Sequence, residues 1–202
     1  MPLWIWPCAA LFLGYFLGSI PFGVVLTRAF GAGDIRQIGS GNIGATNVLR
    51  TGRKGLAAAT LILDALKGVA AVLIVRAMAS PSGSALELIA AAGAFFGHLY
   101  PVWLKFKGGK GVATLLGLCL ILDWRVGLVF ALVWLGGMAL SRISSVGGMV
   151  AALSAPIAAY ILGNAYLSIL LLVLALAVLW KHQANIRRLL DGTEPRIGQK
   201  SA

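Results

Sequence analysis

Long apolar runs separated by short polar breaks limit the possible folds of this chain more than any other feature. A helix needs roughly 20 apolar residues to cross the hydrocarbon core of a bilayer, and several runs here approach that length. Of 202 residues, 59% are hydrophobic and 11% are charged. A water-soluble domain could not bury that much apolar surface. The sequence therefore predicts an all-α polytopic membrane protein, with a single domain over residues 1–202.

Seven apolar segments can be marked out, and we expect about seven transmembrane helices. The fourth and fifth segments are short, so a tilted or re-entrant pair could stand there and the count could fall to five. Either number is odd, which places the termini on opposite sides of the membrane. The first segment has no basic residues before it and continues beyond Leu17, so we expect a retained helix rather than a signal peptide. The segments are Trp4–Ala29, Gly55–Ala79, Ala85–Leu104, Val112–Leu122, Val126–Leu140, Val146–Leu162 and Leu167–Trp180.

Basic residues are concentrated in alternate loops of this topology. One set of loops holds only Arg76 and Arg125, and the other set holds most of the remaining lysines and arginines. Because cytoplasmic loops carry the excess of such residues, we expect the N-terminus outside and the C-terminus in the cytoplasm. The net charge of +11 does not indicate nucleic acid, since the basic residues flank apolar runs. The cytoplasmic set is Arg28, Arg36, Arg50, Arg53, Lys54, Lys105, Lys107, Lys110, Arg142, Lys181, Arg187, Arg188, Arg196 and Lys200.

Few residues inside the apolar segments could carry chemistry. Asp64 and Lys67 are three residues apart, so they share a helix face and can form an ion pair. A structural pair is one interpretation, and direct contact with a substrate is the other. Cys8 and Cys119 lie within apolar runs, which predicts packing roles and neither a disulfide framework nor a metal site.

Small residues at four-residue spacing are typical of helices that pack closely in lipid. The first and third segments each contain such a pair, and we expect both segments to make close contacts. The pairs are Gly14 with Gly18 and Gly93 with Gly97.

The loop Gly39–Arg50 reads Gly-Ser-Gly-Asn-Ile-Gly-Ala-Thr-Asn-Val-Leu-Arg. Glycines allow positive φ, and consecutive backbone amides can form a concave anion site. A helix starting between Asn42 and Ala45 would add free N–H groups. Arg50 could then close on a phosphate as a planar fork. The alternative is a flexible loop, but the run of asparagines ending in an arginine favours anion binding.

A second polar stretch, Gly97–Thr114, contains Gly-Gly-Lys-Gly directly before an apolar segment. It does not have the spacing of a nucleotide P-loop, G-x-x-x-x-G-K-[ST]. What remains is a glycine loop that presents Lys110 at the start of a helix, which is a general way to hold phosphate. His98 is expected at a helix end, where a packed, hydrogen-bonded histidine is more common than a catalytic one.

The last polar stretches are Arg142–Ser145 and Lys181–Glu194. On a helix, His182, Asn185 and Arg188 would share one face. A basic helix that binds anionic lipid head groups is the alternative, but it would explain the arginine and not the histidine or the asparagine.

Three motifs closely resemble those of the PlsY family of acyl-phosphate:glycerol-3-phosphate acyltransferases. They are G-S-G-N-x-G-A-T-N-x-x-R at Gly39–Arg50, G-H-x-x-P-x-x-L-x-F-x-G-G-K-G-V-A-T at Gly97–Thr114 and H-x-x-N-I-x-R-L-x-x-G-T-E at His182–Glu194. The resemblance implies a seven-helix enzyme of the bacterial inner membrane whose active site faces the cytoplasm. It would transfer an acyl group from acyl phosphate to the 1-hydroxyl of glycerol 3-phosphate, giving lysophosphatidic acid. Association with the enzyme that forms acyl phosphate is a further expectation.

Carried over by position, the resemblance implies roles for nine residues. Ser40, Gly41 and Asn42 would hold the acyl phosphate, and Asn47 would brace their loop. Lys110, His182 and Asn185 would be the catalytic residues. These three would surround glycerol 3-phosphate together with Arg50 and Ser145, although Ser144 stands next to Ser145 and the family pattern is loose there.

The chain does not have the catalytic motifs of serine hydrolases, of metalloenzymes or of thioester-dependent glycerolipid acyltransferases. Neither histidine is followed by an aspartate five positions later, and there is no G-x-S-x-G elbow and no cluster of metal ligands. No metal and no cofactor is expected. An anion transporter and a non-catalytic scaffold are the alternatives, but a transporter should contain an internal repeat, and none is apparent.

Overall fold

The computed structural model describes residues 4–78 and 85–197, and all regular elements within these ranges are helices, as predicted. The chain divides into two compact units, one ending at Leu122 and the other beginning at Asp123. We describe each unit by itself. One domain over residues 1–202 stays a prediction.

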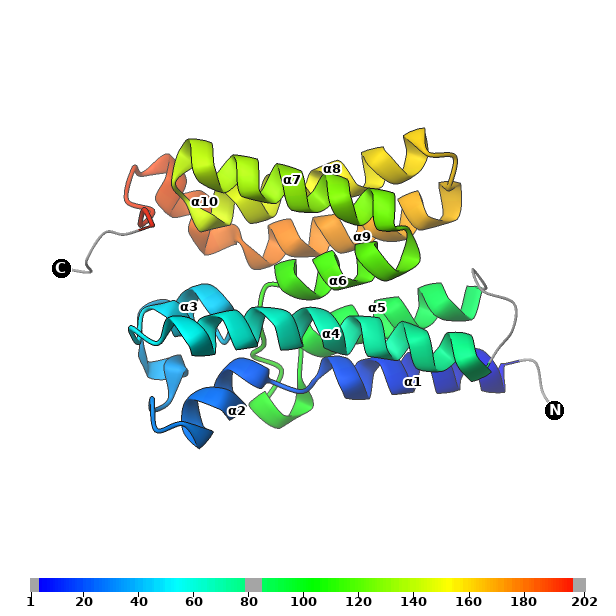
Figure 1. Ribbon diagram of the computed structural model, residues 1–202, viewed down its shortest axis with the longest axis horizontal. Coiled ribbons are helices and arrows are strands. Elements are labelled where there is room, and N and C mark those ends of the chain that lie inside the picture. The colour runs from blue at the N-terminus through cyan, green and yellow to red at the C-terminus, as the bar shows by residue number, and fades with distance from the viewer. Residues whose placement is uncertain (1–3, 79–84, 198–202) are drawn as a thin grey trace. The chain divides into compact units, whose positions relative to one another are not determined.

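The first unit is built on three helices that pack along one another (Figure 1): α1 (Ile5–Gly18), α4 (Lys54–Met78) and α5 (Ala85–Leu99). The shorter α6 (Val112–Leu122) packs mainly on α4. Four short elements occupy the connections: α2 (Phe22–Ala29), the 3₁₀ turn η1 (Ile35–Gln37), α3 (Ala45–Leu49) and the 3₁₀ turn η2 (Val102–Leu104).

Two predicted segments are interrupted by proline, which corrects our expectation of continuous helices. Trp4–Ala29 is broken before Pro21 into α1 and α2, and Ala85–Leu104 ends as α-helix at Leu99, before Pro101. Proline has no N–H to continue the hydrogen-bond ladder, and its ring disfavours the helical conformation of the preceding residue. Both breaks lie beside the polar loops of the unit.

The remaining segments agree with the structure to within about two residues, as expected for helix ends. The second begins at Lys54, and its predicted last residue, Ala79, lies outside the described residues. The second unit contains α7 (Trp124–Ser141), α8 (Ser144–Ile161) and α9 (Ala165–Lys181), in which α8 packs on both neighbours. One helix was not predicted as a separate element: α10 (Gln183–Leu190) follows α9 at a bend of 59°.

Glycines allow α1 and α5 to approach closely, as the spacing predicted. A Cβ atom built on Gly18 would lie 2.0 Å from the carbonyl oxygen of Ala94, and one on Gly97 would lie 2.3 Å from that of Tyr15. Gly14 and Gly93 are equally close to backbone atoms of the opposite helix. The contact is therefore backbone against backbone, with no space for a side chain.

Helix α6 runs beside only the second half of α4. At its start the Thr114 hydroxyl donates to the backbone oxygen of Asp64 (2.9 Å), and near its end Ile121 O accepts from Arg76 (3.1 Å). Asp64 is the eleventh of the 25 residues of α4, which places it roughly 15 Å along the helix axis. The loop that precedes α6 therefore lies beside the middle of α4 rather than beside its first turn.

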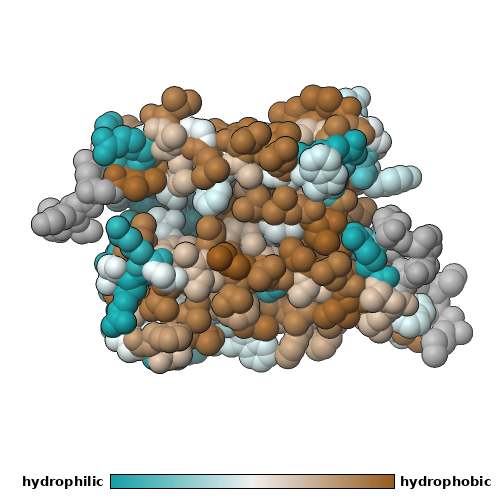
Figure 2. Space-filling model, viewed as in Figure 1, coloured by the Kyte–Doolittle hydropathy of each residue, from teal (hydrophilic) through white to brown (hydrophobic). Residues whose placement is uncertain are grey.

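Five helical stretches of the described residues are long and apolar enough to cross a membrane, with α1 and α2 taken as one stretch, and the bent pair of α9 and α10 would be a sixth. With 11 residues, α6 is shorter than this length. Figure 2 shows hydrophobic residues over most of the visible surface along the helices, with hydrophilic ones near their ends. The chain is thus an integral membrane protein with several apolar helices.

Candidate functional site

The loop before α3 is held in shape by the side chain of Asn47, which is 3% exposed. Its amide nitrogen donates to the backbone oxygens of Ile35 (2.7 Å) and Ile38 (3.0 Å), and its amide oxygen accepts from Ser40 N (3.4 Å). Nearby, Asn42 Oδ1 accepts from Gly44 N (2.9 Å). Two asparagines therefore fix the backbone of residues 35–44, so this part is not a flexible loop.

Backbone conformation and the side chain of Arg50 complete this first loop. Gly39 and Gly41 have φ of +55° and +67°, which favours glycine over other residues. The guanidinium of Arg50 lies against Gly39, where a Cβ atom would be 2.1 Å from Nη1. Helix α3 begins at Ala45, as predicted. Ser40 and Arg50 are exposed, so an anion from solution can reach both.

A carboxylate and two arginines fix the chain just before this loop. Asp34 accepts hydrogen bonds from the side chains of Arg36 and Arg28, and also from Arg36 N. The Arg36 hydrogen bond, followed by those from Arg36 N and Arg28, holds the Asp34 pKa well below its usual range. Two of the basic residues that we used only for orientation therefore also serve a structural role here.

The second loop, Gly108–Gly111, lies flat on the last turn of α5. Gly108 N and Gly109 N donate to the backbone oxygens of Leu99 and His98, both at 3.1 Å. Gly111 has φ of +89°. These contacts place the partly buried Lys110 directly before α6, the position that the sequence predicted.

In the second unit, Ser145 and Asn185 converge on Glu194. The carboxylate of Glu194 accepts from Ser145 Oγ (2.6 Å), Asn185 Nδ2 (2.5 Å) and Arg188 Nε (2.7 Å). Burial alone would raise the pKa of Glu194, but the three hydrogen bonds and the Arg188 charge lower it further than burial raises it. Glu194 therefore holds a negative charge among these donors.

The third motif is only partly as predicted. Asn185 and Arg188 lie on α10 and reach one carboxylate, so they share a face as expected. His182, however, stands at the break between α9 and α10 rather than within one continuous helix. Its Nδ1 lies 2.8 Å from Val178 O. Because a carbonyl only accepts, Nδ1 carries the proton in the neutral ring and Nε2 is then the acceptor nitrogen.

Glu194 was not among the predicted site residues, although it is the last residue of the third motif. Its contact with Ser145 joins positions 49 apart in sequence. The available signal was an acid beside a basic helix, where pairing with a nearby arginine is expected. Nothing in the spacing indicated that it would also bind Ser145 and Asn185.

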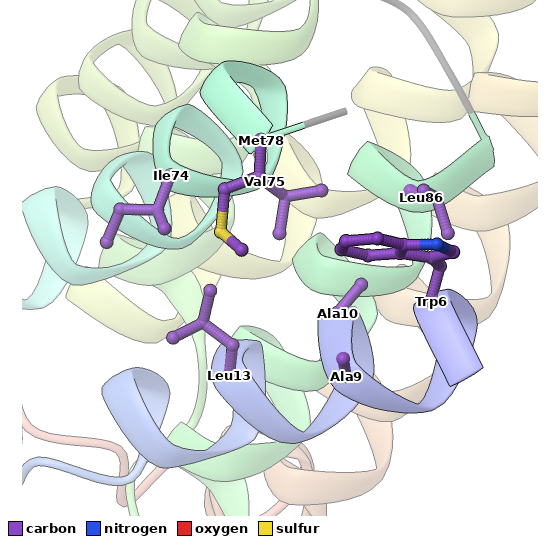
Figure 3. Close-up of a pocket in the computed structure, with 8 residues that line it drawn as sticks. All are labelled: Trp6, Ala9, Ala10, Leu13, Ile74, Val75, Met78 and Leu86. Carbon is purple, nitrogen blue, oxygen red and sulfur yellow. The ribbon is translucent and has the colours of Figure 1, made fainter. Parts of the chain in front are cut away.

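The first unit also contains an apolar pocket (Figure 3). It is lined by side chains of α1, α4 and α5, among them Trp6, Leu13, Met78 and Leu86. None of its lining residues is one of our predicted site residues. Its lining has no groups suited to binding a phosphate, so the polar loops remain the candidate site.

Within residues 4–78 and 85–197, no three His, Cys, Asp or Glu side chains come together as a metal site. Cys119 is buried, in keeping with the predicted packing role. Cys8 is exposed on α1, so our prediction that it packs inside the protein is wrong. An apolar run is compatible with contact to lipid as well as with burial in protein, and the exposed side chain of Cys8 fits the first of these.

Comparison with known proteins identifies the family. The family model for glycerol-3-phosphate acyltransferase matches residues 8–192. The chain is 57% identical to the glycerol-3-phosphate acyltransferase of Ruegeria pomeroyi over 206 aligned positions, covering 100% of both chains. It is 59% identical to that of Mesorhizobium japonicum, covering 95% of this chain and 96% of the relative.

Two crystal structures of PlsY, an integral membrane glycerol 3-phosphate acyltransferase, have the same fold. The glycerol 3-phosphate form has a TM-score of 0.88 at 36% identity and covers 95% of this chain and 96% of its own. The lysophosphatidic acid form has a TM-score of 0.86 at 35% identity and covers 95% of each chain. This chain therefore belongs to the PlsY family of glycerol-3-phosphate acyltransferases.

Proposed function

We propose that this acyltransferase takes its acyl group from acyl phosphate and transfers it to the 1-hydroxyl of glycerol 3-phosphate, releasing lysophosphatidic acid and phosphate. The observation that carries the proposal is the loop Gly39–Asn42, whose backbone is fixed by Asn47 and faced by Arg50. Fixed amides and a guanidinium suit a phosphate group. The PlsY forms named for glycerol 3-phosphate and lysophosphatidic acid support the acceptor and the product.

The roles that we propose follow the family motifs. In the first unit, Ser40, Gly41 and Asn42 hold the acyl-phosphate group, and Asn47 keeps their backbone in the binding conformation. The three hydrogen bonds of Asn47 support the bracing role, because each one ties down a different part of the loop.

Five residues are proposed to bind glycerol 3-phosphate: Arg50 and Lys110 in the first unit, and Ser145, His182 and Asn185 in the second. Ser145 and Asn185 each donate to a carboxylate in this structure, so each can donate to a phosphate or hydroxyl oxygen as well. Lys110, His182 and Asn185 are the ones that we propose to be catalytic.

The reaction needs no protein nucleophile. The hydroxyl oxygen of glycerol 3-phosphate attacks the acyl carbonyl carbon, the bond from that carbon to the phosphate oxygen breaks, and a phosphate oxygen accepts the hydroxyl proton. Phosphate is a good leaving group, and cationic side chains stabilise the charge that it carries away. Much of the rate then comes from holding the two substrates together.

One assay tests the donor. Purified protein is given radiolabelled glycerol 3-phosphate with acyl phosphate, and thioesters of acyl carrier protein and coenzyme A are supplied as competing donors. We expect labelled lysophosphatidic acid from acyl phosphate alone. Product formation from a thioester at an equal rate would contradict the proposed donor, and release of phosphate without labelled lipid would contradict acyl transfer to this acceptor.

We propose that the protein crosses the bacterial inner membrane about seven times, with its C-terminus and the polar loops at the cytoplasmic face. The loops assigned to the outside contain two arginines, and both are paired with carboxylates: Arg76 with Glu87 (2.7 Å) and Arg125 with Asp123 (2.9 Å). The positive-inside rule counts lysines and arginines rather than net charge, so their excess in the other loops is what supports this orientation. Soluble substrates and the enzyme that makes acyl phosphate would meet the protein at the cytoplasmic face.

Cysteine labelling checks this orientation. In a variant without native cysteines, a membrane-impermeant reagent is expected to label Met78→Cys and Trp124→Cys from outside, because both positions are exposed and neither change breaks an arginine pair. Cysteines at Arg53, Lys107 and Arg196 should react only after the membrane is opened. External labelling of Lys107→Cys would contradict the proposed orientation, because the second loop would then face away from its substrates.

His182→Gln tests whether a substrate phosphate accepts the proton. Gln keeps a hydrogen-bond donor but cannot act as a base, and general-base catalysis contributes roughly 10²–10⁴-fold. We therefore expect kcat to fall by less than about 10²-fold, with the main effect a higher KM for glycerol 3-phosphate, and similar behaviour for Asn185→Ala. A loss of kcat near 10⁴-fold in folded protein, with KM unchanged, would instead identify His182 as the base.

A further inference from the structure

Three ionisable side chains are buried together in the first unit, outside the set that we propose to contact substrate. Asp64 is 2% exposed, Lys67 is 4% exposed and His98 is 3% exposed. Asp64 Oδ1 lies 2.8 Å from Lys67 Nζ and 3.7 Å from His98 Nδ1. The sequence predicted the ion pair, but it did not predict that His98 of α5 would join the pair on α4.

Lys67 connects this cluster to the break in the first helical stretch. Its ammonium donates to Ile20 O (2.9 Å), in the segment between α1 and α2, and lies 5.9 Å from the centre of the Phe22 ring. Ile20 O also accepts from Phe22 N at 3.1 Å, so Lys67 supplies a second, charged donor to this carbonyl. This contact ties the connection between α1 and α2 to α4.

His98 connects the cluster to the second loop. Its backbone oxygen accepts from Gly109 N at 3.1 Å, and its ring packs against Gly109 itself. A Cβ atom at Gly109 would lie 2.1 Å from His98 Nε2. One edge of the imidazole therefore faces Asp64, while the opposite edge supports the residue directly before Lys110.

We propose that Asp64, Lys67 and His98 are positioning residues that determine the position of the Lys110 side chain. The carboxylate of Asp64, paired with Lys67, faces one edge of the imidazole at ion-pair distance. The imidazole packs against the backbone of Gly109 and so determines where Lys110 leaves the loop. This inference rests on the proposed role of Lys110 in binding glycerol 3-phosphate.

Energetics favour positioning over stabilisation as the role of this cluster. A buried ion pair contributes little net stability, since removing two charges from water costs about as much as their attraction returns. An apolar cluster of the same volume would fill the space, but it would not place a charged pair between the α1–α2 connection and the imidazole. Contacts that lead to Gly109 are useful where misplacement by about 1 Å can cost about 10²-fold in rate.

A pair of substitutions at Gly109 and His98 tests the contact. Gly109→Ala alone is expected to raise KM for glycerol 3-phosphate about tenfold or more, because the added Cβ pushes the loop off the imidazole. In a His98→Ala background the space is open, so adding Gly109→Ala should change KM by less than about threefold. Gly55→Ala is the control, since no atom lies within 4 Å of the added Cβ.

A second pair of changes tests the charges. Asp64→Asn with Lys67→Met removes both charges together, which avoids leaving one buried charge unpaired. We expect this variant to purify, to raise KM for glycerol 3-phosphate about fivefold or more, and to leave KM for acyl phosphate unchanged. Thr60→Val is the matched control on α4, because its hydroxyl bonds only to Leu56 O of its own helix. If His98→Ala does not fold, His98→Ser opens the same space and serves as the background for Gly109→Ala.

The outcomes separate the two proposals. Gly109→Ala could raise KM for glycerol 3-phosphate as much in the His98→Ala background as in the parent protein. In that case the cluster does not act through Gly109, and the inference is wrong whatever the role of Lys110. If Lys110→Gln leaves KM for glycerol 3-phosphate unchanged, the proposed role of Lys110 fails and the inference fails with it. Relief of the Gly109→Ala defect together with a Lys110→Gln defect supports both.

Discussion

Lys110→Gln and Arg50→Lys are each expected to lower kcat/KM for glycerol 3-phosphate about tenfold or more, in protein that still inserts and purifies. One charge-assisted hydrogen bond to a phosphate contributes roughly 1.5–3 kcal/mol, which corresponds to a change of about 10- to 150-fold. Gln cannot replace the charge of Lys110. Lys at position 50 keeps the charge but loses the planar fork that lies over Gly39.

Neighbouring basic residues provide matched controls. Lys107 is exposed directly before the second loop, which contains Lys110, and Arg53 is exposed three residues after Arg50. Lys107→Gln and Arg53→Lys should leave the initial rate of lysophosphatidic acid formation within about twofold of the parent, because exposed charges away from a ligand contribute little. Full activity in Arg50→Lys would mean that Arg50 acts only as a cation near a helix end. Equal losses of activity in the control variants would indicate an effect of general surface charge.

Gly18→Ala is expected to destabilise the folded protein by up to about 2 kcal/mol, and Gly97→Ala should do the same. Two effects oppose each other. Alanine in a helix is favoured over glycine by about 1 kcal/mol, but overpacking a tight contact costs about 1–3 kcal/mol and occasionally more. At Gly18 the new atom would meet a backbone oxygen at 2.0 Å. Backbone cannot rotate away as a side chain can, so we expect the steric cost to exceed the helix preference.

Thermal unfolding in detergent, followed by circular dichroism, measures the effect. Gly136→Ala in α7 is the control, because no atom lies within 4 Å of its added Cβ and only the helix preference remains. Its Tm should stay the same or rise slightly, while Gly18→Ala lowers the Tm by several degrees. An unchanged Tm in Gly18→Ala would mean that α1 and α5 can separate at little cost.

The sequence predicted the helices better than their interruptions. Apolar runs located α6 to the residue, because the polar loops on both sides are unambiguous. The breaks before Pro21 and Pro101 could have been predicted from proline chemistry, but continuous apolar character concealed them. The bend at His182 contains no proline or glycine, so its cause lies in tertiary packing, which no local pattern reports.

The candidate site shows the same limit. Asn47 and Arg50 could be assigned from their own motif, since their contacts lie within about 15 residues of sequence. The contacts of Glu194 with Ser145 and of His98 with Asp64 join segments that are far apart in the chain. Such pairs depend on how helices pack beside one another, which the local sequence pattern does not show.

The half-length of α6 has a consequence for the ionic environment of Lys110. Because the loop before α6 lies near the level of Asp64, roughly 15 Å along α4, and Lys110 is partly buried there, a phosphate bound to Lys110 is less open to electrolyte than one at the end of α4. Screening by dissolved ions acts over about 8–10 Å at physiological ionic strength and is much weaker for buried pairs. The attraction between Lys110 and its ligand should therefore vary little with salt, unlike that of cations at the membrane surface. An enzyme built in this way keeps its affinity for a small anion while the salt content of the surrounding solution changes.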